Sequence, residues 1–181
     1  MKTKNILKLI ASIIICGFAG VFGSVFTMPE ITGWYAELIK PSFNPPDWVF
    51  GPVWTILYLL MGISLFLVWK NNWKIINQII KPSRKAWNRW SEKLWVGDWK
   101  KQNAIGLFVL QLFFNILWSM VFFGFHSLAW GFAIILMLWF SIIYVIVNFY
   151  RISKPAAWLL VPYLLWVSFA AVLNFAIFWL N

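Results

Sequence analysis

The sequence predicts an all-α integral membrane protein, a five-transmembrane-helix bundle, and three observations support this fold class. First, 62% of the 181 residues are hydrophobic and 11% are charged, whereas an average soluble domain has about 25% charged residues. Second, the apolar residues form five blocks, each close to the roughly 20 residues that a helix needs to cross a bilayer. Third, the basic residues fall between these blocks, on one face of the resulting topology.

The five apolar blocks define the predicted spans. They cover residues 6–26, 48–69, 104–125, 128–149 and 156–180, within a single predicted membrane domain, 1–181. Lys2 and Lys4 precede the first block and Lys8 lies at its start, as basic residues do before the apolar part of a secretory signal. Its length favours a retained helix instead.

Residues with known helix-end preferences lie at two of the span boundaries. Asp47 is placed to cap the second span, and Ser153 and Pro155 are placed to open the fifth. Pro52 and Pro162 fall inside predicted spans, where proline is expected to kink a helix. A kink makes room for a cavity, although proline is also common in membrane helices without one.

Positive charge collects on one side of this topology. An odd number of spans puts the termini on opposite faces, and fourteen of the 15 basic residues fall on the N-terminal face, leaving Lys40 on the other. By the positive-inside rule of bacterial-type inner membranes, the N terminus and the loop 70–103 are cytoplasmic. The net charge of +10 therefore reflects topology, and we expect the lipid bilayer, with no nucleic acid, as the partner.

The loop 70–103 is long, basic and rich in tryptophan. Trp87, Trp90 and Leu94 have helical spacing among basic residues, which predicts an amphipathic helix on the membrane surface near anionic headgroups. A solvated linker is the alternative.

Small residues recur every four positions along the first span. Cys16, Gly20 and Ser24, with Ala19 and Gly23 beside them, form a ridge that permits close helix contact. The ridge serves either packing within the bundle or a dimer interface, and packing is the simpler interpretation.

Residues for conventional catalysis are missing from the sequence. All five acidic residues lie outside the spans or at their ends, so no proton relay is expected inside the membrane. Cys16 is the only cysteine, which excludes an internal disulfide and every multi-cysteine metal site. His126, the only histidine, is either a haem ligand or, more simply, a structural or loop residue. No catalytic residue and no metal site are predicted.

Aromatic and neutral polar side chains lie deep in the spans. Counted from the span ends at 1.5 Å per residue, Trp54, Trp118 and Asn174 lie roughly 10 Å below the face opposite the N terminus. Further members share their helix faces, namely Gln111, Asn115 and Ser119 on the third span and Tyr163, Trp166 and Ala170 on the fifth.

These buried amides need hydrogen-bond partners. Neighbouring helices can supply them, or the faces converge on an aromatic pocket for a flat hydrophobic ligand. Both interpretations stay open on these residues alone. The rigid aromatic loop 27–46 would then cover the pocket as a lid.

At these residues the sequence resembles the TspO/MBR family, the tryptophan-rich sensory proteins and translocator proteins, also called peripheral benzodiazepine receptors. Three blocks carry the resemblance, in order along most of the chain: WYAELIKPSFNPPDWVFGPVWTILYLLMG at 34–62, LQLFFNILWSMVFFG at 110–124 and PYLLWVSFAAVLN at 162–174.

The resemblance implies a five-helix bundle, often a homodimer, that requires no cofactor and binds porphyrins, sterols and benzodiazepine-site ligands beneath the first loop. The resemblance points to Phe50, Gly51, Val53, Trp54, Trp118, Trp166, Ala170 and Leu173 as ligand-binding residues. The predicted set also includes Tyr58, Gln111, Asn115 and Asn174. Two features depart from the family. The loop 70–103 is unusually long, and the chain end VLNFAIFWLN lacks the Tyr and Arg of the cholesterol-recognition pattern of animal members.

We therefore expect a membrane sensor or carrier for porphyrin-type tetrapyrroles, with haem-like or sterol-like molecules as related ligands. The resemblance also implies an alternative, an enzyme that promotes light-dependent oxidative porphyrin degradation, since pocket tryptophans can supply or quench radicals.

Overall fold

The computed structural model describes residues 3–70 and 87–181, with side chains described for 3–70 and 101–181. Within these residues the chain is mainly helical, without a strand. Five helical segments are long and apolar enough to cross a membrane, Thr3–Ile31, Asp47–Lys70, Lys101–Gly124, Leu128–Ile152 and Lys154–Leu180. The predicted five-helix membrane bundle is confirmed. Each predicted span overlaps one of these segments, and the first helix extends beyond its prediction at both ends.

The long helices are α1 (Thr3–Ile31), α3 (Phe50–Lys70), α5 (Trp87–Ser119), α6 (Leu128–Ile152) and α8 (Val161–Leu180). Four short elements connect or extend them: α2 (Trp34–Glu37), the 3₁₀ turn η1 (Asp47–Val49), the π-helical turn η3 (Met120–Gly124) and α7 (Lys154–Trp158). Helix α1 packs on α3 and α5, and α6 packs on α5 and α8.

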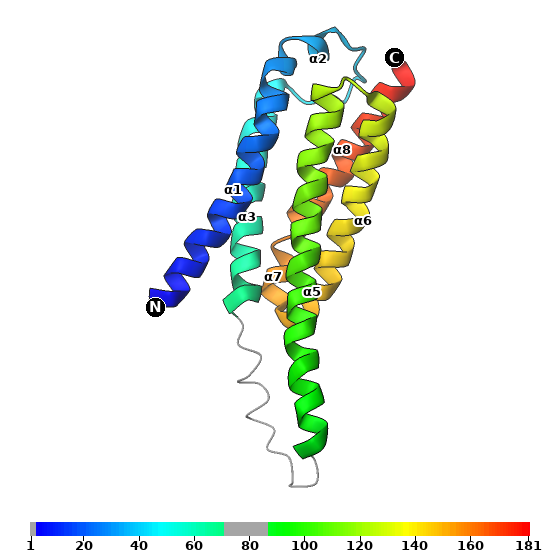
Figure 1. Cartoon of the computed structure of the whole chain (residues 1–181). Helices are drawn as coiled ribbons and strands as arrows, with labels where there is room; N and C mark the ends of the chain where they lie inside the picture. The colour runs from blue at the N-terminus through cyan, green and yellow to red at the C-terminus, as the bar shows by residue number, and fades with distance from the viewer. Residues whose placement is uncertain (1–2, 71–86) are drawn as a thin grey trace.

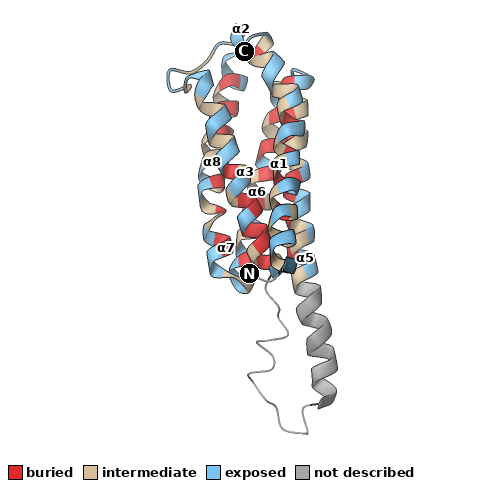
Figure 2. Cartoon of the chain, turned by 90° about the vertical axis from the view of Figure 1, so that its left-hand side faces the viewer, coloured by how far each residue is buried: buried red, intermediate tan, exposed pale blue. Residues whose placement is uncertain are grey.

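The two chain ends lie at opposite ends of the bundle (Figure 1). We call the end that holds α2 and the C terminus the lid face, and the other end the N-terminal face. Buried residues face the interior of the bundle, while exposed ones cover its outside (Figure 2). Exposed side chains on the outer surface include large apolar residues such as Phe18, Phe140 and Leu165. Such a surface belongs in lipid, so the chain is a multi-pass integral membrane protein.

The boundary predictions hold only in part. Asp47 begins η1 after Pro46, but no side-chain capping bond forms there, so the predicted cap is wrong. Pro52 lies in the first turn of α3 and does not interrupt it; the missing N–H is not needed in a first turn. Pro162 is the second residue of α8, directly after a break that separates α7 from α8. A real interruption therefore occurs at Pro162 and not at Pro52.

The ridge of small residues in α1 serves packing within one chain. Cys16, Ala19 and Gly23 are buried, and an added Cβ at Gly23 would lie 3.6 Å from Ser119 on α5. Nearer the start of α1, the backbone of Ile13 approaches Gly62 of α3. A Cβ added at Gly62 would lie 2.9 Å from the Ile13 Cα. Contacts of this kind let α1 cross α3 at short range.

The predicted helix around Trp87–Leu94 forms the beginning of α5 and is continuous with the third span. Its side chains, and residues 71–86 of the predicted loop, lie outside the described residues. At its other end α5 passes into η3, where the wider π turn presents both Phe122 and Phe123 to the interior.

Candidate ligand-binding cavity

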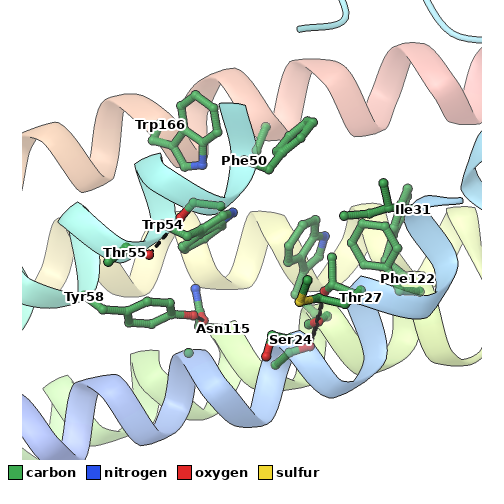
Figure 3. A pocket seen from close by; sticks show the side chains of 18 of the residues that line it. Ser24, Thr27, Ile31, Phe50, Trp54, Thr55, Tyr58, Asn115, Phe122 and Trp166 are labelled. Carbon is green, nitrogen blue, oxygen red and sulfur yellow. Dashed lines mark hydrogen bonds between the residues drawn. The ribbon is translucent and has the colours of Figure 1, made fainter. Parts of the chain in front are cut away.

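A cavity of about 610 Å³ lies inside the lid-face half of the bundle. Its walls come from α1, α3, α5, η3 and α8, and Tyr35 of α2 reaches it from above. The volume falls within the roughly 300–1,000 Å³ of ordinary small-molecule sites. Figure 3 shows Trp54, Tyr58 and Trp166 on one side and Ser24 and Thr27 of α1 on the other.

Stacked aromatic rings form one wall of the cavity. The Trp54 ring lies between those of Tyr58 and Trp118, at centroid distances of 5.6 Å and 6.3 Å. Trp118 in turn stacks on Phe122 at 5.8 Å. The neighbouring rings are inclined by 22–29° to one another, and together they give the cavity an aromatic wall suited to a flat apolar molecule.

Asn115 organises the polar part of this wall. Its Oδ1 accepts a 2.5 Å hydrogen bond from the Tyr58 hydroxyl, and its Nδ2 donates to the Tyr163 hydroxyl at 3.0 Å. The Tyr58 ring points toward Asn115 (Figure 3). One amide thus joins α3, α5 and α8 and fixes the Tyr58 ring.

Two other predicted polar residues, Asn174 and Ser119, also form hydrogen bonds between helices. Trp118 Nε1 donates to Asn174 Oδ1 at 3.2 Å, which joins α5 to α8. The Ser119 hydroxyl donates to the Gly23 carbonyl at 2.7 Å and lies 2.7 Å from the Thr27 hydroxyl, which joins α5 to α1. The buried amides therefore find their partners mainly in neighbouring helices, while aromatic faces line the cavity.

Two buried polar atoms have no partner within the described residues. They are Oε1 of Gln111 and Nε1 of Trp166. Trp166 lines the cavity, and its buried indole N–H has no acceptor among the described residues. Such an atom calls for an explanation because an unmade buried hydrogen bond costs about 1–3 kcal/mol.

The connection from α1 to α3 covers the cavity. The Tyr35 hydroxyl donates to Asn44 Oδ1 at 2.9 Å, which holds the connection folded. Burial, and secondarily the charge of Asp47, raise the pKa of Tyr35 to about 12. At the far side, the backbone of Ile39 exchanges two hydrogen bonds with the Asn181 side chain, at 3.0 Å and 3.1 Å. We call the connection Gly33–Pro46 the lid.

Nothing in the cavity suggests conventional catalysis. The described residues contain no group of three or more His, Cys, Asp or Glu side chains that could hold a metal ion. The cavity is lined by aromatic, aliphatic, amide and hydroxyl groups, with Asp47 at its rim. Its chemistry is that of binding a largely apolar molecule.

A model of the TspO/MBR family matches residues 12–180 of the chain. The chain belongs to the TspO/MBR family. It is 42% identical to the tryptophan-rich protein TspO of Chlorobaculum tepidum over 180 residues, 98% of each chain. It is 34% identical to the human translocator protein over 86% of this chain and 79% of that protein. It is also 31% identical to the tryptophan-rich sensory protein of Cereibacter sphaeroides, over 92% of this chain and 86% of that one.

The structure places most of the residues implied by the TspO/MBR resemblance in the cavity wall. Those in the lining are Phe50, Gly51, Trp54, Tyr58, Asn115, Trp118, Trp166, Ala170, Leu173 and Asn174. Two lie elsewhere. Val53 faces a groove on the outside of the bundle between α3 and α8. Gln111 is buried below the cavity, where its Nε2 lies 3.9 Å from the Met61 sulfur.

Sequence reasoning missed the wall that α1 contributes to the cavity. This wall consists of Ile13, Gly17, Gly20, Val21, Gly23, Ser24, Thr27, Met28 and Ile31. Gly20, Gly23 and Ser24 belong to the predicted packing ridge and also border the cavity, whereas Gly17, outside that ridge, has open space beside it. The sequence did contain a signal for this wall, because three small residues lie close together on one face of α1, namely Gly17, Gly20 and Ser24.

Proposed function

We propose that this TspO/MBR protein is a membrane sensor or carrier that binds porphyrin-type tetrapyrroles, and other flat hydrophobic molecules, in the 610 Å³ cavity. The observation that carries the proposal is the row of stacked rings of Tyr58, Trp54 and Trp118 on the cavity wall. The names of the relatives, translocator protein and tryptophan-rich sensory protein, support the same role.

The chemistry of the wall suits this ligand class. A tetrapyrrole is a flat conjugated disc, and offset stacking on indole faces adds about 0.5–1.5 kcal/mol per ring pair beyond burial. The free N–H of Trp166 can donate to an acceptor on the ligand, such as a carbonyl or carboxylate oxygen. Lys40 of the lid, whose ammonium lies 4.7 Å from the ring centroid of Tyr35, supplies a basic group beside a residue of the cavity lining.

Titration of protoporphyrin IX into detergent-solubilised protein, followed by tryptophan quenching, tests the proposal. Because loss of a stacking partner costs more than about 1.4 kcal/mol of binding, Trp54→Ala should weaken binding about tenfold or more. Trp166→Ala removes both a ring and the free donor and should do the same. The control is Trp130→Ala, since Trp130 is exposed on the outer surface.

Equal affinity in the double variant Trp54→Ala/Trp166→Ala and in the wild type would remove this cavity as the site. Transport is tested separately, by porphyrin flux into proteoliposomes. Binding without flux would support a sensor over a carrier.

Light-dependent porphyrin degradation remains the second candidate because the stacked rings of Trp54 and Trp118 would lie against the bound ligand. Tryptophan can donate an electron to a photoexcited molecule nearby. Illuminated protein should then yield products that illuminated porphyrin in detergent does not, and Trp118→Phe should lower their yield. Identical products in both samples would exclude the enzyme.

Orientation and assembly are proposed on separate grounds. Lys4, Lys8, Lys70, Arg151 and Lys154 lie on the N-terminal face, which we propose is cytoplasmic. Labelling of single cysteines placed at Lys4 or Lys40, in a Cys16→Ser background, tests this in intact cells. A homodimer would need a surface other than the buried part of the α1 ridge, and its mass in detergent can be measured by light scattering.

A further inference from the structure

An ion pair joins two segments at the lid face. Nε2 of His126 lies 3.0 Å from Oε2 of Glu30, with 43% and 27% of the two side chains exposed. Glu30 is in the last turn of α1, directly before the lid, and His126 follows η3 at the start of the turn into α6. The pair carries opposite charges only when the imidazole is protonated.

The lid packs on the same histidine. The Trp34 ring of α2 stacks on the His126 ring, with centroids 4.5 Å apart and planes inclined by 11°. An imidazolium is attracted to the face of an indole more strongly than a neutral imidazole is. Protonation therefore strengthens two contacts of His126 at once, with Glu30 and with Trp34.

His126 occupies an unusual backbone conformation. Its φ is 51°, and no other non-glycine residue in the described part of the chain has a positive φ. Residues with a side chain pay a penalty in this region, although His, Asn and Asp tolerate it better than most. The strained conformation holds the imidazole between Glu30 and Trp34.

Movement of Trp34 would reach the cavity directly. Its ring packs edge-on against Phe122 with centroids 5.6 Å apart, and Phe122 lines the cavity. The next residue, Tyr35, also lines the cavity. Both residues belong to the four-residue helix α2, so release of Trp34 loosens the part of the lid that closes the cavity.

The remaining charged groups near the lid do not pair with His126. Lys40 lies over the Tyr35 ring and donates to the Ala36 carbonyl at 3.3 Å. Asp47 acts on Tyr35, and Glu37 ends α2. Between described residues, His126–Glu30 is the single ion pair at this face.

We propose that His126 is a pH-dependent latch that holds the lid over the cavity when protonated and releases it when neutral. The proposal rests on the proposed function insofar as the lid controls ligand exchange. Because protonation strengthens the contacts of His126 with both Glu30 and Trp34, the latch predicts a lid that is held tighter at lower pH. For a partly exposed pair, the expected change in ligand dissociation rate is about two- to fivefold.

Two measurements between pH 5 and 8 test the latch. The first is the dissociation rate of protoporphyrin IX after dilution or competition. The second is hydrogen–deuterium exchange of the lid peptide, expressed as protection factors to remove the intrinsic pH dependence of exchange, and it needs no ligand. Both should show a lid that is held tighter at pH 5 than at pH 8.

Two variants identify the residues responsible. His126→Asn tolerates the positive φ but carries no titratable group, so both pH dependences should disappear. Glu30→Gln keeps a polar partner without its charge and should reduce them. As a matched control, Asn181→Ala loosens the lid from its other side and should raise the rates at every pH by a similar factor.

The outcomes separate the latch from the proposed function. A full pH dependence of lid protection in His126→Asn would overturn the latch whether or not a porphyrin binds. Lid protection that depends on pH only when His126 is present would support it, even if protoporphyrin IX failed to bind and another ligand had to be sought.

Discussion

Gly20 and Gly17 both lie on the α1 wall of the cavity, yet their surroundings differ sharply. A Cβ built at Gly20 would lie 2.5 Å and 2.6 Å from two ring carbons of Tyr58, whereas a Cβ at Gly17 would meet nothing within 4 Å. Gly20→Ala should therefore displace Tyr58, and Gly17→Ala should not.

The expected cost follows from what holds Tyr58 in place. To reach ordinary contact distance, the ring must move by about 1 Å, against its 2.5 Å hydrogen bond to Asn115 and its stacking on Trp54. Overpacking of this kind costs about 1–3 kcal/mol. Both variants gain up to about 1 kcal/mol of helix propensity, so this gain cancels and their difference reports the clash.

Thermal unfolding in detergent and protoporphyrin IX titration measure the two consequences. Gly20→Ala should unfold at a lower temperature than Gly17→Ala and should bind the porphyrin more weakly, because the displaced ring no longer lies parallel to Trp54. Equal stability and equal affinity of the two variants would refute the close approach of the Tyr58 ring to Gly20 of α1.

Three further predictions concern stability. Asn115→Leu leaves two buried tyrosine hydroxyls without their partner, at about 1–3 kcal/mol each; an unchanged unfolding temperature would contradict the network. Burial and the charge of Asp47 raise the pKa of Tyr35 from 10.0 to about 12, so the unfolded state loses this proton at a lower pH than the folded state does. The free energy of unfolding should therefore fall between pH 10 and pH 12, and it should fall less in Tyr35→Phe. Identical pH profiles of the wild type and the variant would argue against the raised pKa. Gly62→Ala, whose Cβ would lie 2.9 Å from the Ile13 backbone, should destabilise the α1–α3 crossing by about 1–3 kcal/mol, and wild-type stability would show that the helices can separate there without cost.

The spans could be predicted from the sequence because a bilayer imposes a length and a composition on each helix. The deep position of Trp54, Trp118 and Asn174 was also predictable, since depth follows from residue count along a helix. The indole N–H of Trp118 donates to Asn174, which is possible because the two residues lie at the same depth on different helices.

Other features depend on contacts that no local pattern encodes. The sequence of η3 does not differ visibly from an α-helix, yet its wider turn brings Phe122 and Phe123 together on the interior side. Gln111 shares a helix face with Asn115, but only Asn115 reaches the cavity, because the cavity ends between them. The distance between α1 and α3 decides whether Gly17 and Gly20 contact a neighbouring helix or leave open space. That distance depends on the close approach of Ile13 to Gly62, which the sequence of α1 does not encode.

The paired hydrogen bonds between Asn181 and Ile39 bear on how the protein is handled at the bench. A purification tag or fluorescent protein joined after Asn181 would begin beside the lid and compete with it for space. The N terminus lies at the opposite end of the bundle (Figure 1). Exchange rates of a bound molecule are therefore best measured on protein that is tagged at the N terminus.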